Sequence, residues 1–480
     1  MKFAALFACM CFILGPKVNW VTSQTLPLQK QEKLQLPPGK VIESVLCEGD
    51  PAENYALYLP SNYTTAMRWP IIYAFDPEAD GKTPVELYKD IAEKYGFVIA
   101  GSNNSRNFSN NESSKSMSAM WRDTHSRLAL DEHRIYTTGF SGGARMAGAM
   151  AMSCKPCQIA GVIAHGAGYP SLHKPGDDGM LYFFAVGDRD FNWPEVIAIR
   201  REREEQGARY RVRVYPGRHQ WAPAEIMEDA MEWMTLSSMR LGTATPDAAF
   251  IDRFFQQTQG EAHDAEESHD SIAQLSAYRS LVSDFSRLKD VAEYEKKLAS
   301  LKKSAELKSA LKKEQQQITD QSAIESEISP QLRLFADGSA QDPRELESKI
   351  LQEMSVLKSQ REHAKSAVQR LVSERAFSEL WAEGIENGQM EFESRHFDKA
   401  EACFRLMNGV GDSLWPVLLL AEAHVAQGKK KQAIKDLRDA VRRGLKDSKI
   451  IENDDKLQGL KSDPEFGKIL AELNEAREIN

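Results

Sequence analysis

The chain has 480 residues, 42% of them hydrophobic, and a formal net charge of −9. This length exceeds that of one ordinary compact domain and predicts two or three. The acidic balance argues against nucleic-acid binding, because proteins that read nucleic acid are usually basic.

The first 23 residues have the order of a secretory signal peptide. Lys2 supplies a positive charge, Phe3 to Leu14 are uncharged and mostly apolar, and Val21-Thr22-Ser23 offers a cleavage site. The apolar run is shorter than the roughly 20 residues of a membrane-spanning helix. A buried N-terminal helix is the alternative. We therefore expect a secreted or periplasmic protein without a transmembrane segment, whose mature chain starts with a polar linker at 24–40.

Short apolar runs alternate with helical stretches from Val41 to about residue 240. The expected strands lie at 55–59, 70–75, 97–100, 134–138, 161–164, 181–186 and 210–215. The expected helices lie at 85–95, 113–130, 144–152, 195–205 and 224–234. Strands that alternate with helices predict an α/β fold with a mainly parallel sheet covered on both faces.

The amino-acid composition of the chain changes after Gly242. Residues 241–270 are rich in Thr, Pro, Gly and acidic residues and are predicted to be a linker with short helical pieces. The α/β region at 41–240 is therefore expected to fold alone when the chain ends near Thr243, unless the later helices cover its apolar surface.

Residues 271–375 are predicted to form long helices with a coiled-coil-like stripe. Apolar residues recur at spacings of three and four, with breaks at Pro330 and Pro343. The stripe fits either an antiparallel helical hairpin or a dimeric coiled coil.

Residues 376–480 carry a weak repeat shifted by 33 residues, close to the roughly 34 of tetratricopeptide repeats. Generic helical hairpins are the alternative. We expect this helical half to associate with itself, a protein partner or a large substrate.

The chemistry centres on Gly139-Phe140-Ser141-Gly142-Gly143. The motif follows an expected strand and precedes an expected helix, which is the context of a nucleophile elbow. The glycines permit the tight turn, and Ser141 is the predicted nucleophile. The base is predicted to be His219, which follows the last strand; a surface loop histidine is the alternative.

Two carboxylates compete for the role of the acid that orients His219. Both Asp188 and Asp190 follow the strand at 181–186. Asp190, three positions past Gly187, has the better spacing, and Asp188 is the alternative. The developing oxyanion needs N–H donors, and the predicted ones are Gly142 and Asp76 or a neighbour, because the following Pro77 has no N–H.

The six cysteines include a pair at Cys154 and Cys157. A zinc site would need a second pair, which the sequence lacks. A local disulfide is the interpretation that fits an oxidising compartment, and two free thiols are the alternative. The sequence predicts no metal site and no cofactor.

Three segments carry a resemblance: GFSGGARMAG at 139–148, GDRDFN at 187–192 and GRHQW at 217–221. The region from about 50 to 240 resembles the α/β-hydrolase superfamily, within it the exported esterases grouped with polyhydroxybutyrate depolymerases, feruloyl esterases and dienelactone-hydrolase-like proteins. The loop at 101–106 also resembles a loop of this family. The resemblance implies an α/β-hydrolase fold and ester cleavage. It departs at Phe75-Asp76, where many relatives have His-Gly, so the donor pair and the substrate class do not carry over.

The leading hypothesis is an exported carboxylic ester hydrolase that works through an acyl-enzyme intermediate. A serine peptidase or a thioesterase would share the same three residues. A binding or scaffold protein, in which the helical half does the work, is the alternative from another class. Trp121, Trp193 and Trp221 lie near the expected site loops, where they either line a pocket or pack structurally.

Overall fold

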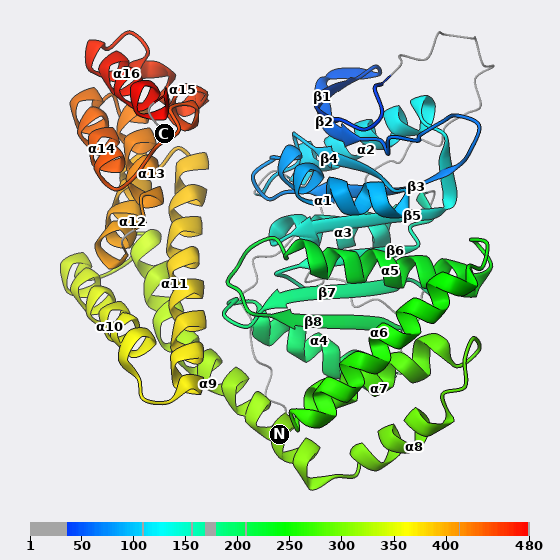
Figure 1. Cartoon of the computed structure of the whole chain (residues 1–480). Coiled ribbons are helices and arrows are strands. Elements are labelled where there is room, and N and C mark those ends of the chain that lie inside the picture. The colour runs from blue at the N-terminus through cyan, green and yellow to red at the C-terminus, as the bar shows by residue number, and fades with distance from the viewer. Residues whose placement is uncertain are drawn as a thin grey trace. The chain divides into compact units, whose positions relative to one another are not determined.

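The computed structural model describes residues 36–107, 110–154, 157–168, 179–206, 209–411 and 413–478. The predicted signal peptide at 1–23 and nearly all of the predicted linker at 24–40 lie outside these residues. The chain divides into two compact units, the first ending at Glu314 and the second beginning at Gln315 (Figure 1). Among the described residues, no helix combines the length and the apolar character needed to cross a membrane.

The first unit is built on a sheet of eight strands in the described part of the chain. The strands are β1 Val41–Cys47, β2 Asp50–Tyr58, β3 Trp69–Phe75, β4 Val98–Ser102, β5 Leu130–Phe140, β6 Gly161–His165, β7 Leu181–Gly187 and β8 Tyr210–Tyr215. Their order is β1-β2-β4-β3-β5-β6-β7-β8. The pairs β1–β2 and β2–β4 are antiparallel and the others are parallel. The predicted fold class is thus confirmed, with a mainly parallel sheet followed by an all-helical region.

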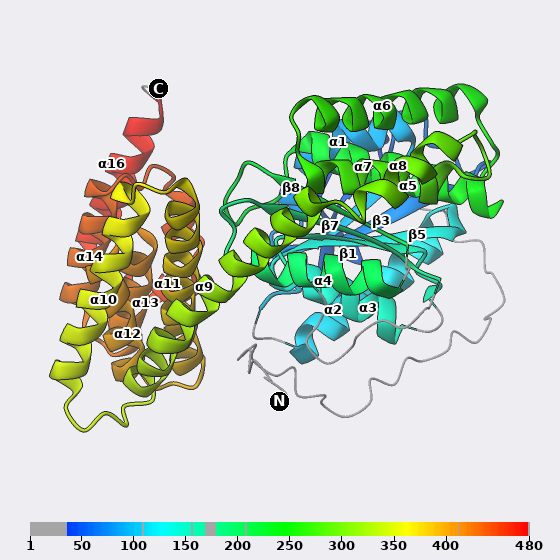
Figure 2. The same cartoon turned by 90° about the horizontal axis from the view of Figure 1, so that it is seen from below.

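Helices cover both faces of this sheet. Figure 2 shows α1 (Lys82–Tyr95) and α5 (Ala224–Leu241) above it. Below it lie α2 (Asn110–Arg127), α3 (Gly142–Ser153) and α4 (Trp193–Gln206). Every residue of β3 and β7 is buried, which explains their unbroken apolar sequences.

The residues after Gly242 differ from the predicted linker and coiled coil. They form α6 (Ala248–Glu267), α7 (Ser271–Phe285) and α8 (Ala292–Leu301), all within the first unit. Phe254, Leu281 and Phe285 are fully buried in the same hydrophobic core as residues of β7 and α5. The apolar stripe over 281–301 is therefore covered by the sheet domain of the same chain, which removes the need for a coiled-coil partner there.

Buried ion pairs connect the edge strand β8 to α5, α6 and α7. Arg211 donates to Asp229 of α5 at 2.8 Å and to Asp284 of α7 at 3.0 Å. Arg213 contacts Asp229 and also Glu261 of α6, the latter at 3.0 Å. Burial alone would raise the pKa of Asp229, but the two guanidinium groups hold it below its ordinary value. β8 is thus tied to three helices that arrive later in the chain.

The second unit is entirely helical in its described residues. Its helices are the later part of α9 (Ala305–Ala336), then α10 Pro343–His363, α11 Ala367–Glu393, α12 Phe397–Val410, α13 Trp415–Ala426, α14 Lys430–Arg442, α15 Lys449–Glu452 and α16 Pro464–Glu478, with a 3₁₀ helix at Asp455–Leu460. The predicted break at Ser329-Pro330 is wrong, because Pro330 lies inside α9. The chain turns instead after Ala336, and Ile328 and Leu332 of α9 share a core with residues of α10.

Small residues set the spacing of the helices in this unit, as the repeat pattern predicts. A Cβ atom on Gly388 of α11 would lie 2.5 Å from the Phe404 ring of α12. Ala400, Ala421 and Ala433, on α12, α13 and α14, are fully buried. The repeat therefore corresponds to closely packed helical hairpins, while its assignment to the tetratricopeptide class stays a prediction.

Candidate active site

Ser141 occupies a strained turn between β5 and α3. Its φ is 54° and its ψ is −122°, a left-handed conformation that non-glycine residues rarely adopt. A Cβ atom on Gly139 would lie 2.2 Å from the carbonyl oxygen of Gly143, and one on Gly143 would lie 2.0 Å from that of Phe75. The glycines of the motif are therefore required by the close approach of α3 to the strand ends.

A chain of hydrogen bonds runs from Ser141 through His219 to Asp190. Ser141 Oγ lies 2.8 Å from His219 Nε2, and His219 Nδ1 lies 2.9 Å from Asp190 Oδ1. Asp190 is fully buried, and its Oδ1 also accepts the backbone N–H of Asn192 at 2.8 Å. The three side chains come from the loops after β5, β8 and β7, all at the carboxyl edge of the sheet. The structure thus brings together the three residues that the sequence analysis singled out.

The second carboxylate of this region, Asp188, faces a different partner. Its Oδ1 accepts the backbone N–H of Gly217 at 2.9 Å, and its side chain is about one third exposed. Between the two candidates for the acid, Asp190 is therefore the one that contacts His219. Asp188 instead joins the loop after β7 to the loop that carries His219.

The predicted oxyanion residues lie beside Ser141. Gly142 opens α3 directly after the serine, and the backbone nitrogen of Asp76, the first residue after β3, lies 3.3 Å from where a Cβ atom on Gly143 would stand. Gly142 thus belongs to the first turn of α3 and Asp76 lies against it. The N–H groups at the N-terminus of a helix favour negative charge.

Asn107 is a neighbour of this site that the sequence analysis missed. Its carboxamide packs against Gly142 so closely that a Cβ atom there would lie 1.8 Å from Asn107 Oδ1. The backbone N–H of Asn107 donates to the Pro77 carbonyl at 2.9 Å. The only signal in the sequence was its position directly after the family-like loop at 101–106.

Aromatic rings surround the imidazole of His219. The Phe140 and Phe191 rings lie 4.5 and 4.0 Å from it, centroid to centroid. The Trp221 ring lies 5.9 Å from the Phe140 ring and 5.2 Å from the imidazole of His165. Burial lowers the pKa of His165 to about 3, so this second histidine is neutral at ordinary pH.

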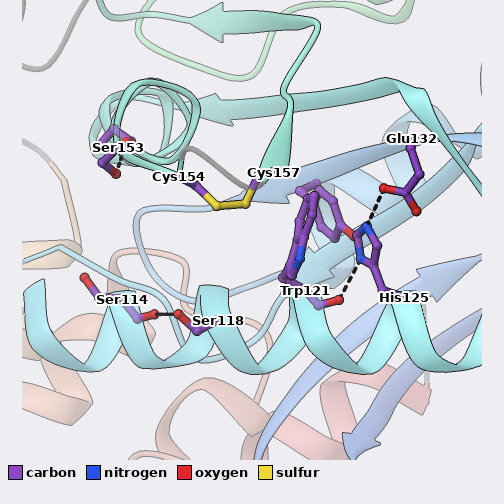
Figure 3. The surroundings of a disulfide bond; sticks show 10 residues. Ser114, Ser118, Trp121, His125, Glu132, Ser153, Cys154 and Cys157 are labelled. Carbon is purple, nitrogen blue, oxygen red and sulfur yellow. Dashed lines mark hydrogen bonds and ion pairs between the residues drawn. A yellow bond between two sulfur atoms is a disulfide. The ribbon is translucent and has the colours of Figure 1, made fainter. Parts of the chain in front are cut away.

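Of the three tryptophans noted in the sequence, Trp221 bonds to a predicted site residue through its side chain, whereas Trp193 does so through its backbone N–H, which donates to the Asp190 carbonyl at 3.0 Å. The Nε1–H of Trp221 donates to Asp76 at 2.9 Å. Trp193 is buried at the start of α4. Trp121 of α2 stacks on His125 with the ring centroids 3.8 Å apart, in the surroundings of the disulfide that Figure 3 shows. Trp121 and Trp193 are therefore packing residues.

The structure joins Cys154 and Cys157 in a disulfide just after α3 (Figure 3). Cys47 and Cys403 are buried free thiols, and burial raises the pKa of each to about 12. Thiols of this kind are inert, so they add no nucleophile. The described residues contain no group of three or more His, Cys, Asp or Glu side chains placed to bind a metal ion.

A cavity of about 400 Å³ lies in the first unit, away from Ser141. Several arginines line it, and three of them are already bound by carboxylates: Arg200 by Glu314, Arg211 by Asp284 and Arg279 by Glu204. The charges of these three arginines are therefore balanced by carboxylates of the same unit.

No protein-family model and no curated protein matches this sequence. Solved structures are similar at low identity. The substrate-bound fluorophosphonate-binding serine hydrolase F of Staphylococcus aureus shares 13% identity over 41% of this chain and 98% of its own, with a TM-score of 0.34. A truncated carbohydrate esterase from gut microbiota shares 15% over 44% and 99%, with a TM-score of 0.35. An esterase of Pyrobaculum calidifontis shares 14% over 43% and 87%, with a TM-score of 0.34.

Proposed function

We propose that this chain is a serine hydrolase that cleaves carboxylic esters through an acyl-enzyme intermediate. The single observation that carries the proposal is the hydrogen-bonded series Ser141–His219–Asp190 at the strained turn before α3. A serine hydroxyl is a weak nucleophile until a neighbouring base accepts its proton. Here the base is in contact with the hydroxyl and is itself oriented by a buried carboxylate.

In the first half of the reaction, Ser141 Oγ attacks the ester carbonyl and its proton passes to His219 Nε2. Asp190 accepts the Nδ1–H of His219, which fixes the tautomer and stabilises the imidazolium that forms. The Gly142 N–H and a second donor near Asp76 stabilise the oxyanion. The tetrahedral intermediate then expels the alcohol, which takes the proton from His219, and leaves an acyl group on Ser141.

In the second half, water replaces the alcohol. His219 removes a proton from the water as it attacks the acyl-enzyme, and the collapse of the second tetrahedral intermediate releases the carboxylic acid and returns the proton to Ser141. We further propose that the protein acts after export and that the second unit serves association, as the leader pattern and the repeat pattern of the sequence indicate.

Labelling with a fluorophosphonate probe, together with turnover of aryl and short acyl esters, tests the proposal. Wild-type protein should be labelled and should hydrolyse the esters, whereas Ser141→Ala should lose both by several orders of magnitude. Ser153→Ala is a matched control, because this serine lies at the far end of α3 and its hydroxyl donates to the Ala149 carbonyl of the same helix. Equal labelling of Ser141→Ala would contradict the proposal. A labelled wild type that cleaves only thioesters or peptides would assign it to those classes instead.

A further inference from the structure

The Asp76 carboxylate connects the two loops that flank Ser141. Its Oδ2 accepts the indole N–H of Trp221 at 2.9 Å, and its Oδ1 accepts the backbone N–H of Glu78 at 2.9 Å. Asp76 follows β3, in the loop expected to hold an oxyanion donor, and Trp221 lies two residues after His219. The buried side chain of Asp76 thus links its own loop to Trp221, which lies 145 positions later in the chain.

Trp221 is itself held in place by other contacts. Its hydrogen bond with Asp76 can therefore fix the position of the loop after β3. Its ring packs edge-on against Tyr88 at 5.9 Å and lies 5.2 Å from the imidazole of His165. The Tyr88 hydroxyl donates to the carbonyl of Ala222, the next residue in the chain, at 2.9 Å. The indole therefore has little freedom to follow the loop after β3 if the Asp76 contact is lost.

A carboxylate suits this position better than an amide. The two N–H groups that meet Asp76 point at different oxygens. A carboxylate has two acceptor oxygens, whereas an asparagine has one acceptor and one donor. Replacement of Asp76 by Asn must therefore break one of the two contacts even though the side chain keeps its size and shape.

We propose that Asp76 is a positioning residue for the reaction, which through Trp221 holds the oxyanion loop at a fixed separation from the base His219. The carbonyl carbon must meet Ser141 Oγ while its oxygen meets the donors and His219 takes up the proton. Small misplacements of such groups cost rate, because catalysis depends on alignment within about 1 Å. This inference rests on the proposed ester hydrolase function of the same site.

The test is a double-mutant cycle of Asp76→Ala, which removes both acceptor oxygens, and Trp221→Phe, measured on a soluble aryl ester. Each single variant should lower kcat roughly 10- to 100-fold while KM changes little, because alignment is lost and substrate binding is not. The double variant should be no slower than the slower single variant, since both changes remove the same contact. The rate of fluorophosphonate labelling should fall in parallel with kcat.

The control is Trp69→Phe, because Trp69 is a buried indole whose N–H donates to the Thr64 carbonyl at 2.9 Å away from the site. It should lower the thermal midpoint about as much as Trp221→Phe and leave kcat unchanged. If Trp221→Phe and Asp76→Ala lower stability and spare kcat, the bridge is structural and the inference is overturned. Fully additive losses in the cycle overturn it as well. A wild type that neither labels nor hydrolyses esters would instead overturn the proposed function itself.

Discussion

Two of the places where the first unit buries charged side chains, the carboxyl edge of the sheet and the β8 edge, differ in how those charges are paired. At the carboxyl edge of the sheet, fully buried Asp190 is paired with His219, a group that can gain and lose a proton. At the β8 edge, Arg211 is paired with Asp229 and Asp284 through guanidinium–carboxylate contacts. The first pairing permits proton transfer, whereas the second one fixes the position of β8.

The backbone shows the same contrast. Ser141 adopts a left-handed conformation, which costs of order 1–3 kcal/mol and persists only where the surroundings impose it. The β8 edge is regular strand and helix, with a continuous parallel register to β7. Ser141 thus carries backbone strain at the position of the proposed chemistry, while the β8 edge supplies stability. The following variants separate the two contributions.

The largest effect is expected from shortening the chain. A chain that ends at Thr243 loses α6 and α7, which leaves Arg211 buried without Asp284 and exposes the core around Phe183 and Trp233. It should fail to fold, whereas a chain that ends at Asp320 keeps the whole first unit and should fold and react with the probe. Circular dichroism melting and fluorophosphonate labelling measure both properties. A soluble, labelled protein ending at Thr243 would show that the later helices are dispensable.

The next largest effect is expected on turnover, from variants at the carboxyl edge of the sheet. Asp190→Asn and His219→Ala should each lower kcat/KM for an aryl ester by roughly 10⁴-fold, because the three residues act as a unit. Thermal melting should show that both proteins remain folded, since the β8 edge is untouched. Activity within tenfold of wild type for either variant would remove that residue from the proposed mechanism.

A third variant breaks the β8 edge and spares the site. Asp284→Ala leaves Arg211 with one partner fewer in a buried position, which should cost about 3–5 kcal/mol of the free energy of unfolding. Turnover by the folded fraction should stay within twofold of wild type. The control is Glu43→Ala, which removes the exposed ion pair with Lys82 and should cost less than about 1 kcal/mol. Urea denaturation compares them, and equal losses would contradict the difference between buried and exposed pairs.

The same contrast explains what the sequence could predict. The site residues lie at strand ends, and the order of strands and helices is readable from local patterns. Ser141 was therefore identified from its glycines, and His219 and Asp190 from their places after β8 and β7. All three come together in the structure as those positions suggested.

Contacts between distant segments could not be predicted in this way. Arg211 and Asp284 are 73 positions apart, and neither belongs to a motif. An apolar stripe such as that of α7 shows that a helix has a face to bury but not which surface covers it. Pro330 is tolerated inside α9 where the sequence suggested a break. The extent of the first unit and the Asp76–Trp221 bridge therefore required coordinates.

A smaller effect tests a buried group that carries no charge. Because burial lowers the pKa of His165 to about 3, the unfolded chain binds a proton between about pH 3 and 6.5 that the folded chain does not. Stability should consequently fall as pH drops below 6.5, by about 1.4 kcal/mol per pH unit from this group. His165→Gln should reduce the loss between pH 7 and 4.5 by about 2.5 kcal/mol in urea denaturation. An unchanged pH dependence would mean that other groups dominate acid sensitivity.

The smallest effect distinguishes Asp188 from Asp190. Asp188 holds the loop of His219 through the Gly217 N–H, and Asn keeps an oxygen that can accept the same bond. Two backbone bonds also hold this loop, from the Asp188 N–H to the Tyr215 carbonyl and from the Arg189 N–H to the Gly217 carbonyl. Asp188→Asn should therefore lower kcat/KM less than about fivefold, which is under about 1 kcal/mol.

Asp188→Ala removes the acceptor and should cost roughly tenfold, through looser placement of His219 and not through its tautomer. The pH–rate profile separates these two causes, because a positioning loss lowers the plateau and leaves the apparent pKa of the profile unchanged. A loss of about 10⁴-fold in Asp188→Asn, with Asp190→Asn active, would exchange the roles of the two carboxylates. The carboxyl edge would then depend on a partly exposed charge, and the contrast with the β8 edge would no longer rest on burial.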